Sequence, residues 1–271
     1  MDLTLLLPMF ALLIVIGAVT GIIAGLLGVG GGIVLVPAFF YAFAQLGYHS
    51  DHIMQVAIGT SAATIVVTSI RSLRAHQKKG AVDGAILRAW APFLVLGAIG
   101  GVLTASQLKS GALQAIFGVL AGIAGLYMAF GRPQWRLGRQ MPGQPVAAIM
   151  AVVLAFCSTL MGIGGGTFGV PLMTLYNQPI HRAVATASGF GILISVPSLA
   201  GFLFFSIPDA PPFTIGAVNL AAFAVIIPMT LLTTPWGVRL AHAMNPAPLK
   251  RAFAIFLVLV AANMIRKVLG W

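Results

Sequence analysis

The chain carries a glycine-rich stretch, Gly28-Val29-Gly30-Gly31-Gly32, that recurs 134 residues later as Gly162-Ile163-Gly164-Gly165-Gly166. A Val-Pro pair follows each stretch at the same distance, as Val36-Pro37 and as Val170-Pro171. Both stretches interrupt long apolar runs. In hydrocarbon every backbone N–H and C=O needs a partner, so a broken helix is tolerated only where it is buried in protein or lines a cavity. Two such breaks in corresponding places are typical of membrane proteins built from internal repeats.

The composition indicates a polytopic membrane protein. Of 271 residues, 59% are apolar and 7% are charged, whereas soluble domains average about 25% charged residues. Long polar stretches are absent, so we expect no soluble domain. The net charge of +11 does not indicate nucleic-acid binding, because the basic residues are spread over separate loops. The first apolar segment, 3–27, lacks a basic leader and a cleavage site, which predicts a retained span rather than a signal peptide.

Ten apolar segments divide into five plus five. They cover residues 3–27, 31–47, 52–74, 84–106, 111–130, 145–161, 166–177, 181–205, 213–238 and 247–268. The halves also match beyond the glycines, since Gly101 through Phe117 aligns with Gly237 through Phe253. An odd number of segments in each half makes the halves inverted relative to each other. The predicted fold class is an all-α membrane protein with two inverted five-segment repeats.

We therefore expect three parts along the chain. Residues 1–130 form a first transmembrane repeat, 131–145 a basic cytoplasmic linker, and 146–271 a second transmembrane repeat. Segments 31–47 and 166–177 are short, because about 20 helical residues are needed to cross a bilayer. They are predicted to be half-helices or re-entrant arms that begin inside the membrane at the glycines.

The distribution of basic residues predicts the orientation. If the loops alternate sides, twelve lysines and arginines lie on one side and three on the other, which indicates that both termini face away from the cytoplasm. The predicted cytoplasmic residues are Arg71, Arg74, Lys78, Lys79, Arg88, Arg132, Arg136, Arg139, Arg182, Arg239, Lys250 and Arg251. The external ones are Lys109, Arg266 and Lys267.

The glycine stretches are predicted to form an anion site. A run of glycines exposes backbone N–H groups, and the helix that follows begins with unpaired N–H donors and the positive end of its dipole. Two such ends brought together would bind an anion without a charged side chain. The alternative is that the glycines only allow close helix packing. The predicted substrate-binding glycines are Gly28, Gly30, Gly31, Gly32, Gly162, Gly164, Gly165 and Gly166.

Nearby hydroxyl groups are a second set of candidate ligands. Thr60, Thr64 and Thr68 recur every four residues and so share one helix face. Hydroxyls donate to oxyanions without a buried cation, although serine and threonine also bond back to the carbonyl four residues earlier or join helices. The predicted substrate-binding hydroxyls are Thr60, Ser61, Thr167, Thr186 and Ser188, and Ser158 also flanks the second glycine stretch.

Three further residues are candidates for a gate or a mouth. Gln55 and His181 stand just before related stretches of the two halves, where a helix-capping role is the alternative. Arg71 is expected to anchor a helix at the membrane surface and to attract anions at the cytoplasmic mouth.

The residue types that the sequence lacks exclude several mechanisms and kinds of site. The chain has no glutamate, and none of its four aspartates lies in the core of an apolar segment, so the intramembrane carboxylates of many proton-coupled transporters are missing. Cys157 is the single cysteine, which excludes an internal disulfide and a thiolate metal site. No metal or other cofactor is expected. An enzyme is not expected either, because His181 and Ser188 are about two turns apart on one helix, too far for proton transfer.

The motifs resemble those of the TauE/SafE sulfite exporter family, also called the toluene sulfonate uptake permease family. The similarity lies in Gly25-Leu26-Leu27-Gly28-Val29-Gly30-Gly31-Gly32, Ala57-Ile58-Gly59-Thr60-Ser61 and the second glycine stretch, each glycine stretch with its Val-Pro. The resemblance implies a multi-pass transporter of the bacterial inner membrane for sulfite, sulfonates such as sulfoacetate, or related compounds. The second half departs from the pattern, because Ala185-Thr186-Ala187-Ser188 stands where the first half has Gly59-Thr60-Ser61.

The predicted function is thus transport of a small anionic sulfur compound, in the export direction, by a protein whose other partners are membrane lipids. An anion channel and a cation-coupled uptake permease for organosulfur compounds are the alternatives. The sequence leaves the substrate, the coupling ion and the oligomeric state open.

Overall fold

The computed structural model describes residues 3–27, 31–131, 135–243 and 247–270, and these ranges form ten α-helices. The all-α prediction is confirmed. The helices are α1 (Leu3–Leu27), α2 (Gly32–Gln45), α3 (Ile53–Gln77), α4 (Gly84–Gln107), α5 (Ser110–Phe130), α6 (Val146–Leu160), α7 (Gly166–Leu175), α8 (Ile180–Leu203), α9 (Leu220–Ala243) and α10 (Ala247–Val268).

One predicted segment, 213–238, does not begin as a helix. Strands β1 (Thr214–Ile215) and β2 (Val218–Asn219) pair there as a short antiparallel hairpin before α9 starts. Gly216, with φ of 61°, forms the turn between the strands. The apolar composition of this stretch does not by itself distinguish a β-hairpin from the start of a helix.

Five of the described helices, namely α3, α4, α5, α8 and α9, are long and apolar enough to cross a membrane. The chain is therefore a multi-pass membrane protein. Helices α2 and α7 have 14 and 10 residues, which makes them about 21 and 15 Å long at 1.5 Å per residue. Both are shorter than the roughly 30 Å hydrocarbon core.

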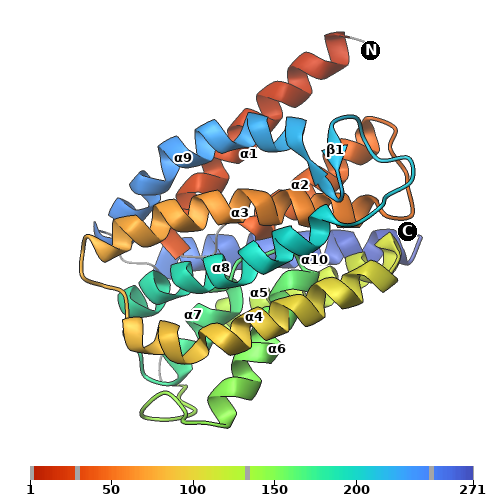
Figure 1. The fold of residues 1–271 in the computed structure, drawn as a ribbon. Coiled ribbons are helices and arrows are strands. Elements are labelled where there is room, and N and C mark those ends of the chain that lie inside the picture. The colour runs from red at the N-terminus through yellow and green to blue at the C-terminus, as the bar shows by residue number, and fades with distance from the viewer. Residues whose placement is uncertain (1–2, 28–30, 132–134, 244–246, 271) are drawn as a thin grey trace.

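Helices α3 and α8 lie side by side at the centre of the molecule (Figure 1). They are also the most buried of the five long helices, because 83% of the apolar stretch of α3 and 67% of that of α8 is buried inside the protein. Their residues Ser72 and Ser188 meet at one end, while Ser69 faces Gly191 one turn further along. The two helices therefore run antiparallel.

The helix pairings occur in corresponding sets when α1–α5 are matched with α6–α10. Helix α1 packs on α9 as α6 packs on α4, and α3 packs on α9 as α8 packs on α4. The close contacts correspond as well. A Cβ at Gly237 would lie 3.0 Å from Cα of Ile22, and a Cβ at Gly101 would lie 3.0 Å from the carbonyl oxygen of Phe156. Gly101 and Gly237 are aligned in the sequence, and Ile22 precedes Phe156 by 134 residues.

Candidate functional site at the glycine-rich helix breaks

The first break ends at Gly31, where α2 begins. Gly31 has φ of 80°, a left-handed conformation that glycine adopts without strain, and its carbonyl oxygen accepts the first bonds of α2 from Val34 and Leu35. Pro37 lies inside α2, as Pro171 lies inside α7. The predicted site residues Gly28 and Gly30 lie outside the described residues.

The two breaks are in direct contact. A Cβ added to Gly32 would collide with the carbonyl oxygen of Gly162 and would lie 2.8 Å from Cα of Ile163. Gly162 has φ of 61° and is tightly enclosed, with Cα of Ile58 2.9 Å from the position of an added Cβ. Ser61 of α3 donates a hydrogen bond of 2.7 Å to the carbonyl oxygen of Gly162. Residues of the two halves thus meet at the point where both helices are interrupted.

The second break is buried and rich in unpaired donors. Residues 161–167 are all buried. The first N–H groups of a helix have no partner within it, and the backbone N–H groups of Gly164, Gly165 and Gly166 have no backbone acceptor among the described residues. Nearly all buried backbone N–H groups in folded proteins are paired. These donors therefore point to a ligand or water at the start of α7.

Two buried side chains beside the second break also lack a hydrogen-bond partner in the described part of the chain. The hydroxyl oxygens of Ser158 and Thr167, on either side of the second break, have no hydrogen-bond partner among the described residues. Both side chains are almost fully buried, with exposed fractions of 0% and 2%. The positive end of the α7 dipole lies at Gly166, and no acidic or basic residue occurs in 158–167.

The hydroxyls of Thr60 and Thr186 bond to other parts of the protein. The Thr60 hydroxyl donates to the Val56 carbonyl at 2.6 Å and accepts the Asn219 backbone N–H at 2.9 Å. The Thr186 hydroxyl accepts the Asp83 backbone N–H at 2.9 Å. Asn219 and Asp83 cap the helices that follow them, since their side-chain oxygens accept backbone N–H groups of α9 and α4.

The other predicted hydroxyls are bonded within the helix pair α3–α8. Ser188 bonds to Ser72 at 3.0 Å and to the carbonyl oxygen of Val184 at 3.2 Å. Thr64 and Thr68 donate to the carbonyls four residues earlier. The regular spacing of these threonines therefore reflects bonds along their own helix.

The three residues predicted for a gate or mouth are not brought together. Gln55 is buried near the start of α3, where its amide nitrogen donates to the carbonyl oxygen of Leu108 and so joins α3 to the end of α4. Arg71 is exposed and lies 16 residues further along α3, about 24 Å away at 1.5 Å per residue. His181 is exposed at the start of α8, which lies near Arg71 because α3 and α8 are antiparallel.

Sequence reasoning missed Asp83 and Asn219. Each stands directly before a long apolar helix, and aspartate and asparagine are favoured at that position. That signal identifies a helix cap. It does not show that a threonine 159 residues away in sequence accepts the N–H of the capping residue.

The described helices define a polytopic membrane protein. Residues 13–264 match the family described as Sulfite exporter TauE/SafE, and the chain belongs to that family. No solved structure matches the chain.

Several curated relatives match this chain over most of their own length and carry general names. A "Probable membrane transporter protein" of Haemophilus influenzae is 29% identical over 258 residues, covering 94% of this chain and 98% of the relative. A "Probable membrane transporter protein" of Methanocaldococcus jannaschii is 26% identical, and the match covers 91% of this chain and 90% of the relative. "Probable membrane transporter protein YunE" of Bacillus subtilis is 27% identical, and the match covers 94% of this chain and 97% of the relative. These names agree on membrane transport and leave the substrate open.

Proposed function

We propose that this protein exports small sulfur-containing anions, such as sulfite, sulfoacetate or other sulfonates, through an anion site where the two glycine-rich helix breaks meet. The observation that carries the proposal is the contact of Gly32 with Gly162 and Ile163. It brings the N-terminal end of α2 against the break that precedes α7. Oriented N–H groups and helix N-termini attract anions without a charged side chain.

The unpaired donors support the same site. Buried backbone N–H groups at Gly164–Gly166 and the free hydroxyls of Ser158 and Thr167 provide several donors in one short stretch. A sulfite or sulfonate group has three oxygens that accept hydrogen bonds. Leaving buried donors without partners costs about 1–3 kcal/mol each, and a bound oxyanion would remove that cost. We assign the direct contacts to this stretch, with Ser61 holding Gly162 in place.

The arrangement of the halves supports alternating access to this site. We propose that the two five-helix halves act as inverted repeats in a bacterial inner membrane, with both termini outside. The corresponding helix pairings and the antiparallel packing of α3 on α8 agree with a two-fold relation between the halves. Inverted repeats commonly move against each other around a substrate site near the middle of the membrane.

Cation-coupled uptake is the second candidate, and the two prolines favour it. A proline in a helix leaves the carbonyl four residues earlier without its usual N–H donor. Pro37 and Pro171 do this for Ile33 and Thr167, in the first turns of α2 and α7. Freed carbonyl oxygens close to an anion site are the kind of ligand that Na⁺ uses in transporters.

The experiment that tests the proposal is a flux assay with purified protein in liposomes. Sulfite, sulfoacetate and taurine would be loaded inside and their release measured against chloride, with protein-free liposomes as the control. Saturable release of sulfite or sulfoacetate supports the proposal. Release of chloride at the same rate without saturation would indicate a channel, and no release of any sulfur anion would contradict the proposed substrate class.

A further inference from the structure

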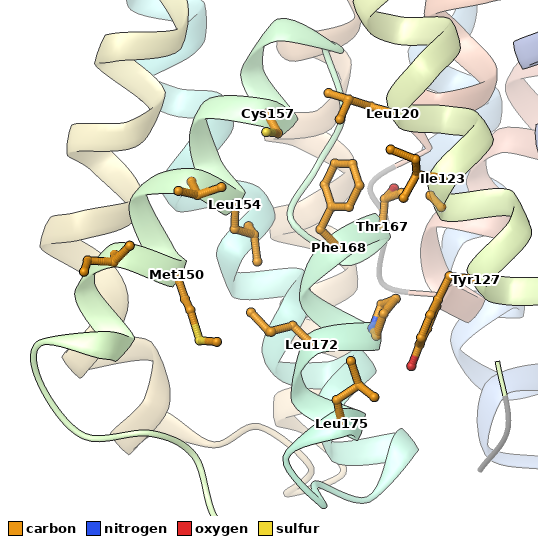
Figure 2. A pocket seen from close by; sticks show the side chains of 14 residues that line it. Leu120, Ile123, Tyr127, Met150, Leu154, Cys157, Thr167, Phe168, Leu172 and Leu175 are labelled. Carbon is orange, nitrogen blue, oxygen red and sulfur yellow. The ribbon is translucent and has the colours of Figure 1, made fainter. Parts of the chain in front are cut away.

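A large apolar pocket lies between α5, α6 and α7 and extends to Thr167, just after the second break. Its volume is about 440 Å³, within the size range of pockets that hold organic ligands. Figure 2 shows its lining side chains, which run from Leu120 and Cys157 at one end to Leu175 and the Tyr127 hydroxyl at the other. Phe168 and Leu172 of α7 form part of its wall.

The pocket opens toward the bilayer. Ile123 of α5 and Ile149 and Val153 of α6 line it and are themselves 57%, 63% and 55% exposed. Apolar side chains exposed to this degree in a multi-pass membrane protein face the hydrocarbon of the bilayer. Apart from the hydroxyls of Thr167 and Tyr127 the lining is apolar, so the body of the pocket does not suit the headgroup of a sulfur anion.

A cation and two aromatic rings lie at the Tyr127 end. Trp135 lies beside Tyr127, with ring centroids 6.4 Å apart. Arg136 is exposed, and its Nη1 donates to the carbonyl oxygen of Thr174 at 3.2 Å, next to the lining residue Leu175. The Leu137 backbone N–H also donates to the Leu175 carbonyl at 2.8 Å, which fixes this loop against the end of α7. Tyrosine and tryptophan mark the membrane–water interface.

We propose that a phospholipid of the surrounding membrane occupies this pocket, with one acyl chain between α5, α6 and α7 and its phosphate at Arg136. The apolar interior fits a hydrocarbon chain, and arginine donates two parallel hydrogen bonds to phosphate oxygens. The open side faces the bilayer, so a lipid enters without crossing protein. The acyl chain then packs on Phe168 and Leu172, and so supports α7, the short helix that begins at the second break.

Photolabelling tests this proposal without a transport measurement. Full-length protein in liposomes would be exposed to a phosphatidylglycerol whose acyl chain carries a diazirine, and the labelled residues would be mapped by mass spectrometry. We expect labelling concentrated at deep lining residues such as Leu120, Leu154 and Phe168. Even labelling over all bilayer-facing residues, with no excess at the pocket, would overturn the proposal.

Two pairs of variants test the binding of the acyl chain and the binding of the headgroup independently. Cys157→Trp fills the deep end and should abolish pocket labelling, whereas Leu103→Trp, at a 64% exposed position on α4 outside the pocket, should leave it intact. Arg136→Gln leaves the interior unchanged and should lower labelling of the pocket, whereas Arg139→Gln in the same loop should not. If a diazirine alkane without a headgroup labels the pocket as strongly as the lipid, and Arg136→Gln changes neither, the phosphate assignment is wrong. If the purified protein instead carries a different organic molecule in the pocket, the lipid assignment is wrong.

Discussion

The hydroxyl of Thr60 on α3 accepts the backbone N–H of Asn219, the residue that caps α9, at 2.9 Å. The same bond occurs in the other half, where Thr186 on α8 accepts the backbone N–H of Asp83, the cap of α4, at 2.9 Å. Each bond joins a central helix to the start of a helix from the opposite half. Together they hold the two halves in register at two matching points.

Replacing Thr60 with valine should therefore destabilise the protein. Valine has nearly the same shape but accepts no hydrogen bond, so the buried N–H of Asn219 would lose its partner at a cost of about 1–3 kcal/mol. The measurement is the melting temperature of purified protein in detergent, which should fall by several degrees. Thr186→Val should have an effect in the same direction.

Thr64→Val is the matched control for this change. Among the described residues, the Thr64 hydroxyl bonds only to the carbonyl of Thr60 on its own helix. Its loss should change the melting temperature much less. An equal effect of both substitutions would show that the cross-half bond adds nothing to stability.

Removing the hydroxyl of Ser158 should impair transport without loss of stability. This hydroxyl has no partner among the described residues, so Ser158→Ala breaks no bond within them. If it donates to the anion, its loss costs about 1.5–3 kcal/mol, which corresponds to roughly tenfold to hundredfold weaker binding. The measurement is the KM for sulfite release from liposomes, and Thr167→Val should behave in the same way.

Ser195→Ala is the control for a buried serine outside the site. Its hydroxyl donates to the carbonyl of Gly191 within α8. We expect an unchanged KM. Normal transport by both Ser158→Ala and Thr167→Val would show that these hydroxyls do not bind substrate.

The contact between the two breaks predicts that Gly32 tolerates no side chain. In Gly32→Ala the new methyl group would press on the carbonyl of Gly162, so either the breaks separate or the site closes. Release of sulfite should be abolished while the protein still inserts into the membrane. Gly122→Ala, where the nearest atom to the added Cβ is 3.6 Å away, should transport normally.

The helices follow from the sequence because each is an apolar run bounded by glycine, proline or polar residues. The ten predicted segments match the ten helices closely, apart from the hairpin before α9. The repeated glycines also indicate that two breaks exist. Which hydroxyls stay free depends on contacts between distant parts of the chain. Thr60 and Ser158 look alike in sequence, yet only Thr60 receives an N–H from a residue 159 positions away.

Cysteine labelling tests the predicted orientation. Gly111 lies at the start of α5 on the predicted external side, whereas Gly84 and Gly143 lie on the predicted cytoplasmic side, and a Cβ at each meets no atom within 4 Å. In a Cys157→Ala background, Gly111→Cys should react with a membrane-impermeant maleimide in intact cells. Gly84→Cys and Gly143→Cys should react only after permeabilisation. The opposite pattern would reverse the topology and place the basic linker, residues 131–145, on the external side.

The proposed export predicts a dependence on membrane potential. An anion that leaves a negative-inside cell gains about 2.3 kcal/mol per charge per 100 mV, so the potential alone can drive export. The chain has no glutamate, and Asp51, Asp83 and Asp209 lie between the described helices, so those helices carry no carboxylate that could move a proton with the substrate. In liposomes with a clamped potassium-diffusion potential and no Na⁺ or pH gradient, sulfite release should carry current and rise as the inside becomes more negative. Electroneutral release, or release that begins only when a Na⁺ gradient is imposed, would contradict uniport and would favour coupling through the freed carbonyls of Ile33 and Thr167.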